Sequence, residues 1–529
     1  MIRLVTVDEM RAIEREGNAR GVSYAEMMER AGRGVARVIA QLFGDCQPRN
    51  VLGLVGSGNN GGDALVALET LAAAGWHARA YLARPRPADD VLLRRFLSIG
   101  GEVGSLEQDG NYTTLDRWLE QASVLLDGVL GTGAQLPLRA ELEAVLAHVR
   151  DFALLPSVVA VDCPSGVDCD SGGASPATIK AELTVCLEAV KRGLVQFPAA
   201  GLTGRLVVIP LRLPSDLDAC RAISLYVTSG DLARAWLPQR PADAHKGTFG
   251  TVLVVGGCND YIGAPALAAE AAYRMGAGLV RVATTPVVRD ALAGHQMETT
   301  WLALPEQNGG ISAAGVETVL SNLERVTALL VGPGIGSLAG TGDFVRGLFT
   351  KAKTLPPLVL DAEGLRLTAG LENWANLLPR ESVLTPHPGE MSSLTGLAIA
   401  EIQADRIGTA LRYARYWGHV VVLKGAFSVV ASPLGMAQVI PVASAALSRA
   451  GSGDVLAGLI TGLRAQGLAA FPAAVAAAWI HALAGLTALR RTGQSASVLA
   501  GDILRAVPEV IRAIKNGEHT RDPLWVVDA

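Results

Sequence analysis

The chain contains little charge and few aromatic residues. Lysine, arginine, aspartate and glutamate make up 18% of its 529 residues, and aromatic residues make up 5%, whereas 50% of the residues are hydrophobic. The net charge is −4, with no basic stripe and no acidic tail. This composition argues against nucleic acid and membrane surfaces as partners. It is typical of tightly packed α/β enzymes, and a chain of this length is expected to form two or more domains.

Several signatures are also missing. The six cysteines are dispersed without a C-x-x-C pair, which favours reduced thiols over a metal site or a disulfide framework. The N-terminal stretch "MIRLVTVDEMRAIERE" is too charged for a signal peptide. We therefore expect a cytoplasmic protein. A Walker A motif, G-x-x-x-x-G-K-[ST], is absent, so any nucleotide must be held by a different scheme.

One long segment without formal charge tests the expectation of a soluble chain. Residues 468–489, "LAAFPAAVAAAWIHALAGLTAL", are numerous enough to span a bilayer. Alanine is the commonest residue of the segment, Pro472 and His481 lie inside it, and alanine contributes little to membrane insertion. We predict a buried helix of a large α/β core instead.

Strand-like apolar runs alternate with helical patterns along the whole chain. In the first part, runs end in the polar clusters "GNNGGD", "DGVLGTG" and "VDCPSGVD", and residues 25–43 ahead of them have the pattern of an amphipathic helix. This alternation predicts a parallel sheet with helices on both faces, whose carboxyl-end clusters converge on a ligand crevice. The pattern restarts after residues 210–230 with different clusters. We therefore expect two different αβα domains, at 1–225 and 226–529.

The stretch "VLGLVGSGNNGGDALVALETL" contains G-x-G-x-x-G at Gly56, Gly58 and Gly61. This spacing is found in nicotinamide-dinucleotide sites but is weak evidence alone. A redox site also needs an acidic residue at the end of the next strand, and Arg84 stands there. The two amides and the carboxylate of Asn59, Asn60 and Asp63 are not needed in a plain dinucleotide loop either. A dehydrogenase is therefore disfavoured.

The segment "GSGDVLAG", Gly451 to Gly458, is the most informative part of the second half. Glycines at a helix N-terminus leave backbone N–H groups aimed at an anion. Asp454 inside such a site would repel phosphate unless it acts as a general base on a hydroxyl that takes part in phosphoryl transfer. The alternative is a first-turn acid that only stabilises the helix dipole. The glycine context favours the catalytic interpretation.

The second half resembles the ribokinase-like superfamily and, more closely, the ADP-dependent NAD(P)H-hydrate dehydratase family. The motifs "HKGTFGTVLVVGG", "GAPALAAEAAYRMGAGLV", "VGPGIG", "VLDAEGL", "TPHPGEMSSLTG", "LKGAFS" and "GSGDVLAG" carry the resemblance, in order, from about 240 to 510. The resemblance implies Asp454 as the base on the substrate hydroxyl. It implies substrate contacts from Ala264, Gly334, His387 and Asp454, and nucleotide contacts from Lys424, Gly425, Ala426, Phe427, Ser428, Gly451, Ser452 and Gly453.

Other residues of the second half keep two interpretations. Asp361 ends a strand at the same sheet edge and could organise Mg²⁺ on the nucleotide phosphates, or it could cap the following turn. His245 and Lys246 could touch phosphate, or they could pack the entry to the first strand. His481 is expected in the core rather than at a ligand.

The first half, residues 1–225, resembles the NAD(P)H-hydrate epimerase family through "GNNGGD", "DGVLGTG" and "VDCPSGVD". Amide, carboxylate and hydroxyl oxygens suit a non-transition cation, and the resemblance implies a K⁺ site formed by Asn60, Asp127 and Ser165. It also implies substrate contacts from Asn59, Asn60, Gly61, Gly62, Asp63, Gly131, Thr132, Gly133, Ala134, Gln135, Leu136, Pro137 and Asp162, with Asp162 a candidate for the proton transfers.

This half departs from the epimerase pattern in two places. The family usually has glycine where Ala64 follows "GNNGGD", and a tyrosine that often follows the "GTG" loop is not evident. Alanine would be strained if position 64 needed a positive φ, but it suits a first helical turn better than glycine does. We favour the helical interpretation.

Together the resemblances imply a bifunctional repair enzyme with a Rossmann-like three-layer αβα sandwich and a ribokinase-like αβα domain. The first domain would interconvert the R and S hydrates of NADH and NADPH (NADHX and NADPHX). The second would dehydrate the S hydrate with ADP and Mg²⁺, leaving AMP and phosphate. A homo-oligomer is expected. The alternative is a ribokinase-like small-molecule kinase with a ligand-binding N-terminal module.

Overall fold

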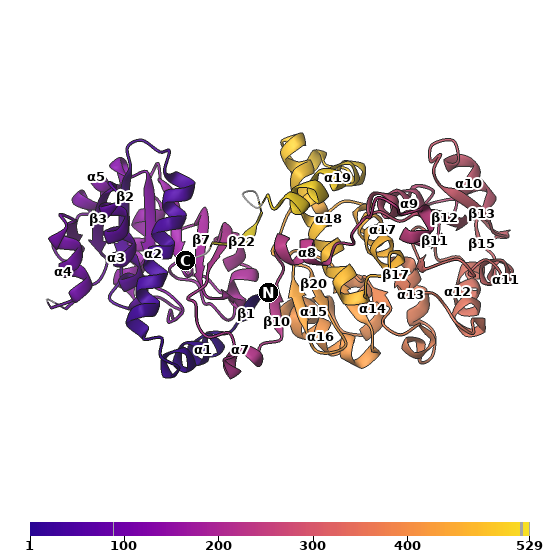
Figure 1. Ribbon diagram of the computed structural model, residues 1–529, viewed down its shortest axis with the longest axis horizontal. Coiled ribbons are helices and arrows are strands. Elements are labelled where there is room, and N and C mark those ends of the chain that lie inside the picture. Colours follow the sequence, from indigo (N-terminus) through magenta and orange to yellow (C-terminus); the bar gives the residue numbers. More distant parts are fainter. Residues whose placement is uncertain (88, 519–521, 528–529) are drawn as a thin grey trace. The chain divides into compact units, whose positions relative to one another are not determined.

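The computed structural model describes residues 1–87, 89–518 and 522–527, which form two compact units (Figure 1). The first unit contains Ile2–Val227 together with the C-terminal strand β22 (Leu524–Val526), and the second contains Thr228–Asp522. Strand β22 pairs in parallel with β9 (Arg205–Ile209) of the first unit. The C-terminal strand therefore belongs with the first unit, whereas the expected range 226–529 placed it in the second domain.

The main sheet of the first unit is parallel throughout. Its strand order is β22–β9–β7 (Leu183–Leu187)–β6 (Ser157–Val161)–β5 (Val124–Gly128)–β2 (Asn50–Val55)–β3 (His77–Leu82)–β4 (Glu102–Ser105). A smaller set places β1 (Ile2–Val5) between β8 (Val190–Lys191) and β10 (Leu225–Val227). Because all carboxyl ends of the main strands meet at one edge, the predicted polar clusters converge there.

Helices cover both faces of this sheet. Alternate residues of a strand face opposite sides, and both sets are buried: Val51 and Val55 pack with α2 (Tyr24–Phe43) and α3 (Asn59–Ala73). Leu52 and Leu54 pack with α5 (Thr113–Gln121) and α6 (Ala140–Arg150) on the other side. The predicted three-layer sandwich is confirmed. Helices α1 (Val7–Ala19), α4 (Val91–Ser98) and α7 (Asp218–Arg221) complete the unit.

The second unit contains a mixed sheet. Its order is β13 (Thr300–Ala303)–β12 (Leu279–Thr284)–β11 (Thr251–Val255)–β16 (Ala328–Val331)–β17 (Leu358–Leu360)–β18 (Val383–Leu384)–β19 (Val420–Leu423)–β20 (Val429–Ala431)–β21 (Ala437–Val439). The strands from β13 to β19 are parallel, and β20 and β21 continue antiparallel. A short hairpin, β14 (Glu306–Gln307) and β15 (Gly310–Ile311), lies apart from this sheet.

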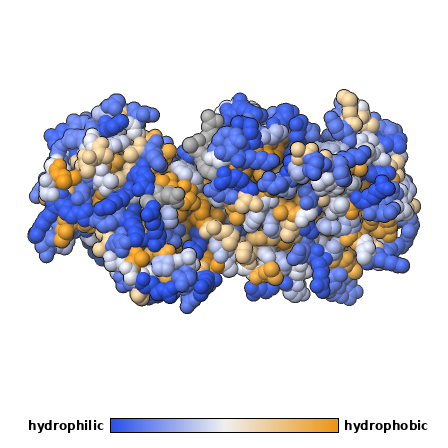
Figure 2. Space-filling model, in the orientation of Figure 1, coloured by the Kyte–Doolittle hydropathy of each residue, from blue (hydrophilic) through white to orange (hydrophobic). Residues whose placement is uncertain are grey.

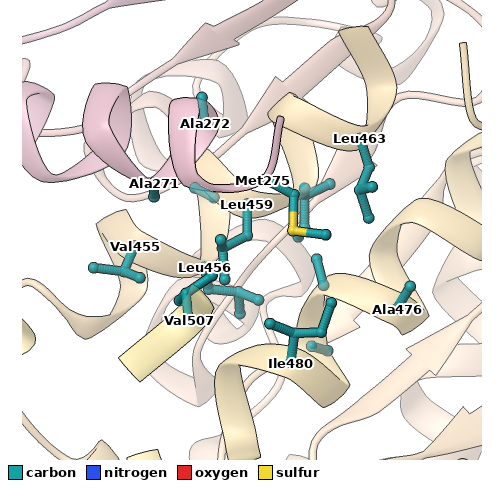
Figure 3. Close-up of a cluster of buried hydrophobic side chains, with 14 of the residues drawn as sticks. Ala271, Ala272, Met275, Val455, Leu456, Leu459, Leu463, Ala476, Ile480 and Val507 are labelled. Carbon is teal, nitrogen blue, oxygen red and sulfur yellow. The ribbon is translucent and has the colours of Figure 1, made fainter. Parts of the chain in front are cut away.

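Small residues allow the helices of this unit to pack closely. Figure 3 shows the core where α9 (Gly263–Arg274), α17 (Ser452–Ala465), α18 (Ala470–Thr492) and α19 (Ala500–Asn516) meet. A Cβ added to Gly458 would lie 2.2 Å from the Ala268 carbonyl oxygen, so only glycine permits this approach. The remaining helices are α8 (Gly230–Trp236), α10 (Pro286–Leu292), α11 (Gly315–Leu320), α12 (Ala339–Lys351), α13 (Glu363–Ala369), α14 (Pro388–Thr395), α15 (Ile399–Ala404) and α16 (Arg406–Trp417).

The uncharged segment near the C-terminus is helix α18. It is long and apolar enough to cross a membrane, but 78% of its most apolar window is buried inside the second unit. Figure 2 shows mostly hydrophilic residues over the outer surface on the visible face. The prediction of a core helix is confirmed.

Candidate active sites

A cavity of about 690 Å³ opens at the carboxyl edge of the first sheet. Asn59, Asn60 and Asp63 line it from the start of α3, and Asp162 lines it from the end of β6. The loop after β5 adds Gly131, Thr132, Gly133 and Ala134. The cavity therefore brings together three sequence motifs that are far apart along the chain.

Some of the residues expected at this cavity do not line it. Gln135, Leu136 and Pro137 lie further along the loop and are not among the lining residues. Gly61 and Gly62 are buried, and a Cβ on Gly61 would lie 2.0 Å from the Gly56 carbonyl oxygen. These two glycines allow close packing at the start of α3. Ala64 lies inside this helix, as predicted, and its Cβ would be 2.5 Å from a Cβ added to Gly128.

The three residues expected to bind a cation form one buried cluster. Ser165 donates from its backbone N–H to Asp127 Oδ2 at 2.8 Å and from its hydroxyl to Oδ1. Asn60 Nδ2 donates to the Leu130 carbonyl at 2.9 Å, which leaves the amide oxygen available. Burial raises the pKa of Asp127, the hydrogen bonds from Ser165 lower it, and the net effect is an increase. The cluster thus supplies hard oxygen donors, the kind that alkali and alkaline-earth cations prefer.

A second charged cluster lies in the wall of the same cavity. Asp162 adopts a positive φ of 64°, and its Oδ1 accepts from the Leu187 N–H at 3.0 Å and from the Lys191 ammonium. Lys191 is only 1% exposed and also donates to the Leu187 carbonyl at 3.1 Å. Burial lowers and the Asp162 charge raises the pKa of Lys191, and the net effect is an increase. The ion pair therefore holds Asp162 in a fixed geometry.

Sequence reasoning missed several residues of this cavity. Arg11 and Glu14 line it from α1, and Tyr24 lines it from the start of α2. Lys191 is not a lining residue but forms the buried ion pair with Asp162. Tyr24 supplies an aromatic side chain that the loop after β5 lacks. Arg84, noted only as an obstacle to a redox site, also lines the cavity. None of the five belongs to a glycine-rich motif.

The second site lies where β17, β18, β19 and α17 meet. Gly451, with a φ of +87°, turns the chain into α17, and Asp454 stands in the first turn of this helix. Burial is the main cause that raises the pKa of Asp454 to about 7, with Asp361 adding to the increase and Lys424 opposing it. A carboxyl group with this pKa can accept a proton near neutral pH.

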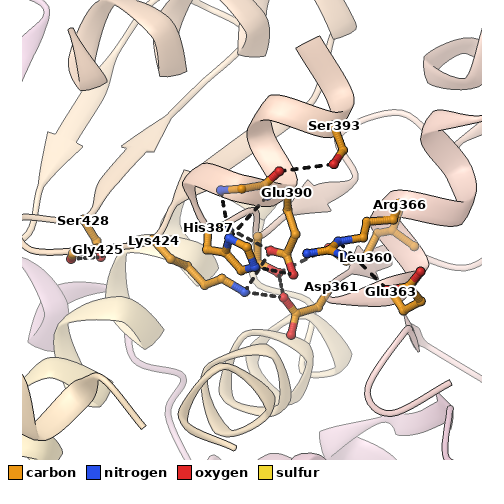
Figure 4. A network of polar contacts seen from close by, with 12 residues as sticks. Leu360, Asp361, Glu363, Arg366, His387, Glu390, Ser393, Lys424, Gly425 and Ser428 are labelled. Carbon is orange, nitrogen blue, oxygen red and sulfur yellow. Dashed lines mark hydrogen bonds and ion pairs between the residues drawn. The ribbon is translucent and has the colours of Figure 1, made fainter. Parts of the chain in front are cut away.

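Lys424 links the acidic residues of this site (Figure 4). Its ammonium lies 2.7 Å from Asp361 Oδ1 and 3.5 Å from Glu390 Oε2. Thr385 donates its hydroxyl proton to Asp361 Oδ1 at 2.7 Å. A Cβ added to Gly453 would lie 3.4 Å from the Lys424 Nζ, so the ammonium borders the glycine turn. The side chain of Lys424 therefore lies between the carboxylates and the predicted anion site.

His387 has a defined orientation at the start of α14. Its Nδ1 accepts from the N–H groups of Gly389 at 2.9 Å and Glu390 at 3.3 Å, so the proton of the neutral ring is assigned to Nε2. Burial lowers the pKa of His387, which favours this neutral form. The Nε2 atom lies 3.3 Å from Glu390 Oε1, and the ring is 46% exposed. His387 can therefore act as a hydrogen-bond donor.

The other expected nucleotide and substrate residues lie in turns, apart from Ala264, which lies in the first turn of α9. Lys424 to Ser428 connect β19 to β20, and the Ser428 hydroxyl donates to the Gly425 carbonyl at 2.9 Å. Gly334 and Ala264 lie together, because a Cβ on Gly334 would be 2.9 Å from the Ala264 Cβ. His245 and Lys246 precede β11, at the opposite edge of the sheet from Asp361 and Lys424. Their position favours the packing interpretation.

His481 is a core residue, as expected, but it also supports the glycine turn. Its Nε2 lies 3.0 Å from the Ser452 hydroxyl, and both side chains are buried. Burial lowers the pKa of His481 to about 4. A neutral imidazole from α18 therefore fixes the serine of the predicted anion site.

Two family models match the chain. The dehydratase model, described as NAD(P)H-hydrate dehydratase, matches residues 252–509, and the model of the YjeF-related protein N-terminus matches residues 24–193. The bifunctional NAD(P)H-hydrate repair enzyme of Moorella thermoacetica is 36% identical over 98% of both chains. The chain belongs to this family of repair enzymes. The corresponding Escherichia coli enzyme is 31% identical over 95% of this chain and 93% of its own.

Two solved structures each match about half of the chain. The ADP/ATP-dependent NAD(P)H-hydrate dehydratase of Bacillus subtilis, co-crystallised with ATP and Mg²⁺, is 29% identical, with a TM-score of 0.46. It covers 54% of this chain and 98% of its own. A ribokinase-like superfamily protein of Enterococcus faecalis is 23% identical, with a TM-score of 0.47, and covers 55% of this chain and 96% of its own. The YjeF-related match lies within the first unit, and the dehydratase match lies within the second.

Proposed function

We propose that each of the two sites carries one of the family's two activities. The cavity at the first sheet interconverts the R and S hydrates of NADH and NADPH, and the site around Asp454 dehydrates the S hydrate. The observation that carries the second assignment is the buried Asp454, with its pKa of about 7, beside a glycine turn and an ammonium group. A general base and an anion site are the two elements that phosphoryl transfer to a hydroxyl requires.

In the second site, Asp454 takes the proton from the ring hydroxyl while the hydroxyl oxygen attacks the terminal phosphorus of ADP. The phosphoryl group passes to the ring oxygen, and AMP leaves. Loss of phosphate from C6, together with a proton from C5 to solvent, then forms the C5=C6 double bond and regenerates NADH or NADPH. Phosphorylation is needed because hydroxide is a poor leaving group. The backbone N–H groups of Gly451, Ser452 and Gly453 stabilise the negative charge that develops on the phosphoryl oxygens.

Lys424 and Asp361 support this transfer in different ways, one as a cation and the other as a carboxylate. The Lys424 ammonium lies beside the glycine turn, where it can neutralise phosphate charge, and the segment from Lys424 to Ser428 lines the AMP portion. The carboxylate oxygens of Asp361 and Glu390 are hard donors that fit Mg²⁺. Bound Mg²⁺ would supply charge neutralisation on the nucleotide phosphates. Ala264, Gly334 and His387 would contact the hydrated ring and its diphosphate.

In the first site, the loop from Gly131 to Ala134 would bind the substrate phosphates, and Asp162 would face the nicotinamide ring. The oxygen cluster of Asn60, Asp127 and Ser165 fits K⁺ by the chemistry of its donors. The epimerase has a clear purpose beside the dehydratase. The dehydratase consumes only the S hydrate, so the R hydrate must be converted before it can be repaired.

The deciding experiment offers the purified chain both hydrates with ADP and Mg²⁺. We expect full recovery of reduced-nicotinamide absorbance, together with AMP and free phosphate in equal amounts. A stable phosphorylated product would support the small-molecule kinase instead. Recovery that stops at the S fraction would remove the epimerase assignment alone.

We also infer a cytoplasmic location, which the six free cysteines support. A homo-oligomeric state stays a prediction, and sedimentation equilibrium of the purified chain measures it directly.

A further inference from the structure

Two of the three carboxyl groups that line the cavity of the first unit, Asp63 and Asp162, lie in contrasting surroundings. Asp162 is paired with the buried Lys191 and accepts a second hydrogen bond from the Leu187 N–H at 3.0 Å. Asp63 is 7% exposed, and within residues 1–87, 89–518 and 522–527 no hydrogen bond reaches its carboxyl group. One carboxyl group is therefore held by a cation, and the other faces the cavity without a donor.

The surroundings of Asp63 favour its neutral form. Burial is the largest cause that raises the pKa of Asp63 well above its usual value, and the charges of Asp162 and Glu14 raise it further. Lys191 opposes this increase but is paired with Asp162. The other charged or titratable residues that line the cavity are Arg11, Tyr24 and Arg84. A buried carboxyl group without a donor, in the same cavity as one paired with an ammonium, is an arrangement that suits an acid and a base.

We propose that Asp63 is the general acid and Asp162 the general base of epimerisation, with Lys191 as the residue that positions Asp162. This division rests on the proposed epimerase function and deepens it, because Asp63 was expected only to bind along the substrate.

The assignment gives a balanced reaction. Asp63 donates its proton to the hydroxyl on C6 of the hydrated ring, the C6–O bond breaks, and water leaves. The lone pair of the ring nitrogen forms the C6=N bond. A water molecule then forms a new C6–O bond on the opposite face as the C6=N π electron pair returns to the ring nitrogen, and this water gives a proton to Asp162. Transfer of this proton from Asp162 back to Asp63, through water in the cavity, restores the starting state.

Another residue that lines the cavity could also serve as the general acid. Glu14 of α1 also lines the cavity, and burial raises its pKa, with Lys191 opposing and Asp162 adding to the effect. Asp63 is the better candidate because it lies in the first turns of α3, close in sequence to Asn59 and Asn60, which are expected to bind the substrate. A Glu14→Gln variant therefore serves as the matched control.

The test uses the full chain and one purified hydrate epimer, without ADP, so that the dehydratase is idle. The rate of conversion to the other epimer is measured from acidic to alkaline pH and corrected for the uncatalysed reaction. For the unaltered chain we expect a fall at alkaline pH, because the acid Asp63 must be protonated. Asp63→Asn should lower kcat by about 10²-fold or more and abolish the fall at alkaline pH. Glu14→Gln should keep that fall.

Lys191→Met should lower kcat for epimerisation more than it changes KM, because the ion pair no longer holds Asp162 in position, and Lys191→Arg should restore most of the original rate. Addition of ADP and the S hydrate checks that each variant remains folded and active at the second site. An Asp63→Asn profile with an unchanged alkaline fall would overturn the acid assignment. No epimerisation by the unaltered chain would instead remove the proposed function itself.

Oxygen-labelled water tests the bond-breaking step. Each catalysed inversion should place one solvent oxygen on C6. Inversion without incorporation of the label would overturn the C6–O cleavage, because the original hydroxyl would then have remained attached to the substrate.

Discussion

The Lys424 ammonium lies 2.7 Å from Asp361 Oδ1, and both groups border the glycine turn that carries Asp454. This ion pair connects the end of β19 to the end of β17. It places a positive charge where a transferring phosphoryl group would carry negative charge.

Removal of this ammonium should change the pH dependence of dehydration. Lys424 lowers the pKa of Asp454, which burial raises to about 7. Lys424→Met should therefore raise that pKa further, so the loss of activity on acidification should begin at higher pH. We also expect kcat/KM at pH 7 to fall by about 10²-fold, because a preorganised charge is lost. The measurement is kcat/KM for the S hydrate from pH 5 to pH 9. An unchanged acid limb would contradict the electrostatic coupling.

The contact between Ser452 and His481 should matter for nucleotide binding. His481→Leu leaves the buried Ser452 hydroxyl without its partner, which should cost about 1–3 kcal/mol of stability. It should also raise KM for ADP more than it lowers kcat, because the glycine turn loses its support. His481→Gln retains a hydrogen-bonding group and should recover most of both losses. Equal behaviour of the two variants in urea unfolding and in steady-state kinetics would assign His481 to simple core packing.

Arg84 is expected to bind an anionic part of the substrate in the first cavity. Arg84→Ala should raise KM for epimerisation by about tenfold and leave kcat nearly unchanged, because the residue lines the cavity but is not assigned to proton transfer. Arg33→Ala, on the exposed side of α2, is the control and should leave both constants unchanged. A fall in kcat at constant KM would contradict a binding role.

Ala64 should contribute to stability rather than impair catalysis. It lies within α3, where glycine is less favourable than alanine by about 1 kcal/mol. Ala64→Gly should lower the free energy of unfolding of the first unit by about this amount and retain epimerisation. A large rise in epimerase activity would show instead that alanine at this position strains the site.

Much of both sites could be predicted because parallel strands end at one edge. Asp127, Asp162 and Asp361 each stand at the carboxyl end of a buried strand; Asp162 lines the first cavity, and Asp361 contacts Lys424 at the second site. Glycine-rich stretches also marked the starts of α3 and α17 in the sequence.

The remaining residues carry no local signal. Glu14 lies in the charged helix "VDEMRAIEREGNA", where it is indistinguishable from a solvated side chain. Lys191 precedes an arginine in "VKRGL", which reads as a surface pattern, yet it is 1% exposed. Only tertiary packing shows that each of these charges faces Asp162. The C-terminal strand β22 was missed likewise, because pairing with β9 depends on contacts far apart in the sequence.

The most direct test of the account compares the unaltered chain with Asp454→Asn on a mixture of both hydrates, with ADP and Mg²⁺. Asp343→Asn, an exposed substitution on α12, is the control. We predict complete recovery of reduced-nicotinamide absorbance with the unaltered chain and the control. With Asp454→Asn we predict a dehydration rate lower by about 10²–10⁴-fold, while the two hydrates still interconvert. Recovery by Asp454→Asn at the normal rate would contradict the central claim that this carboxyl group is the base of the dehydratase.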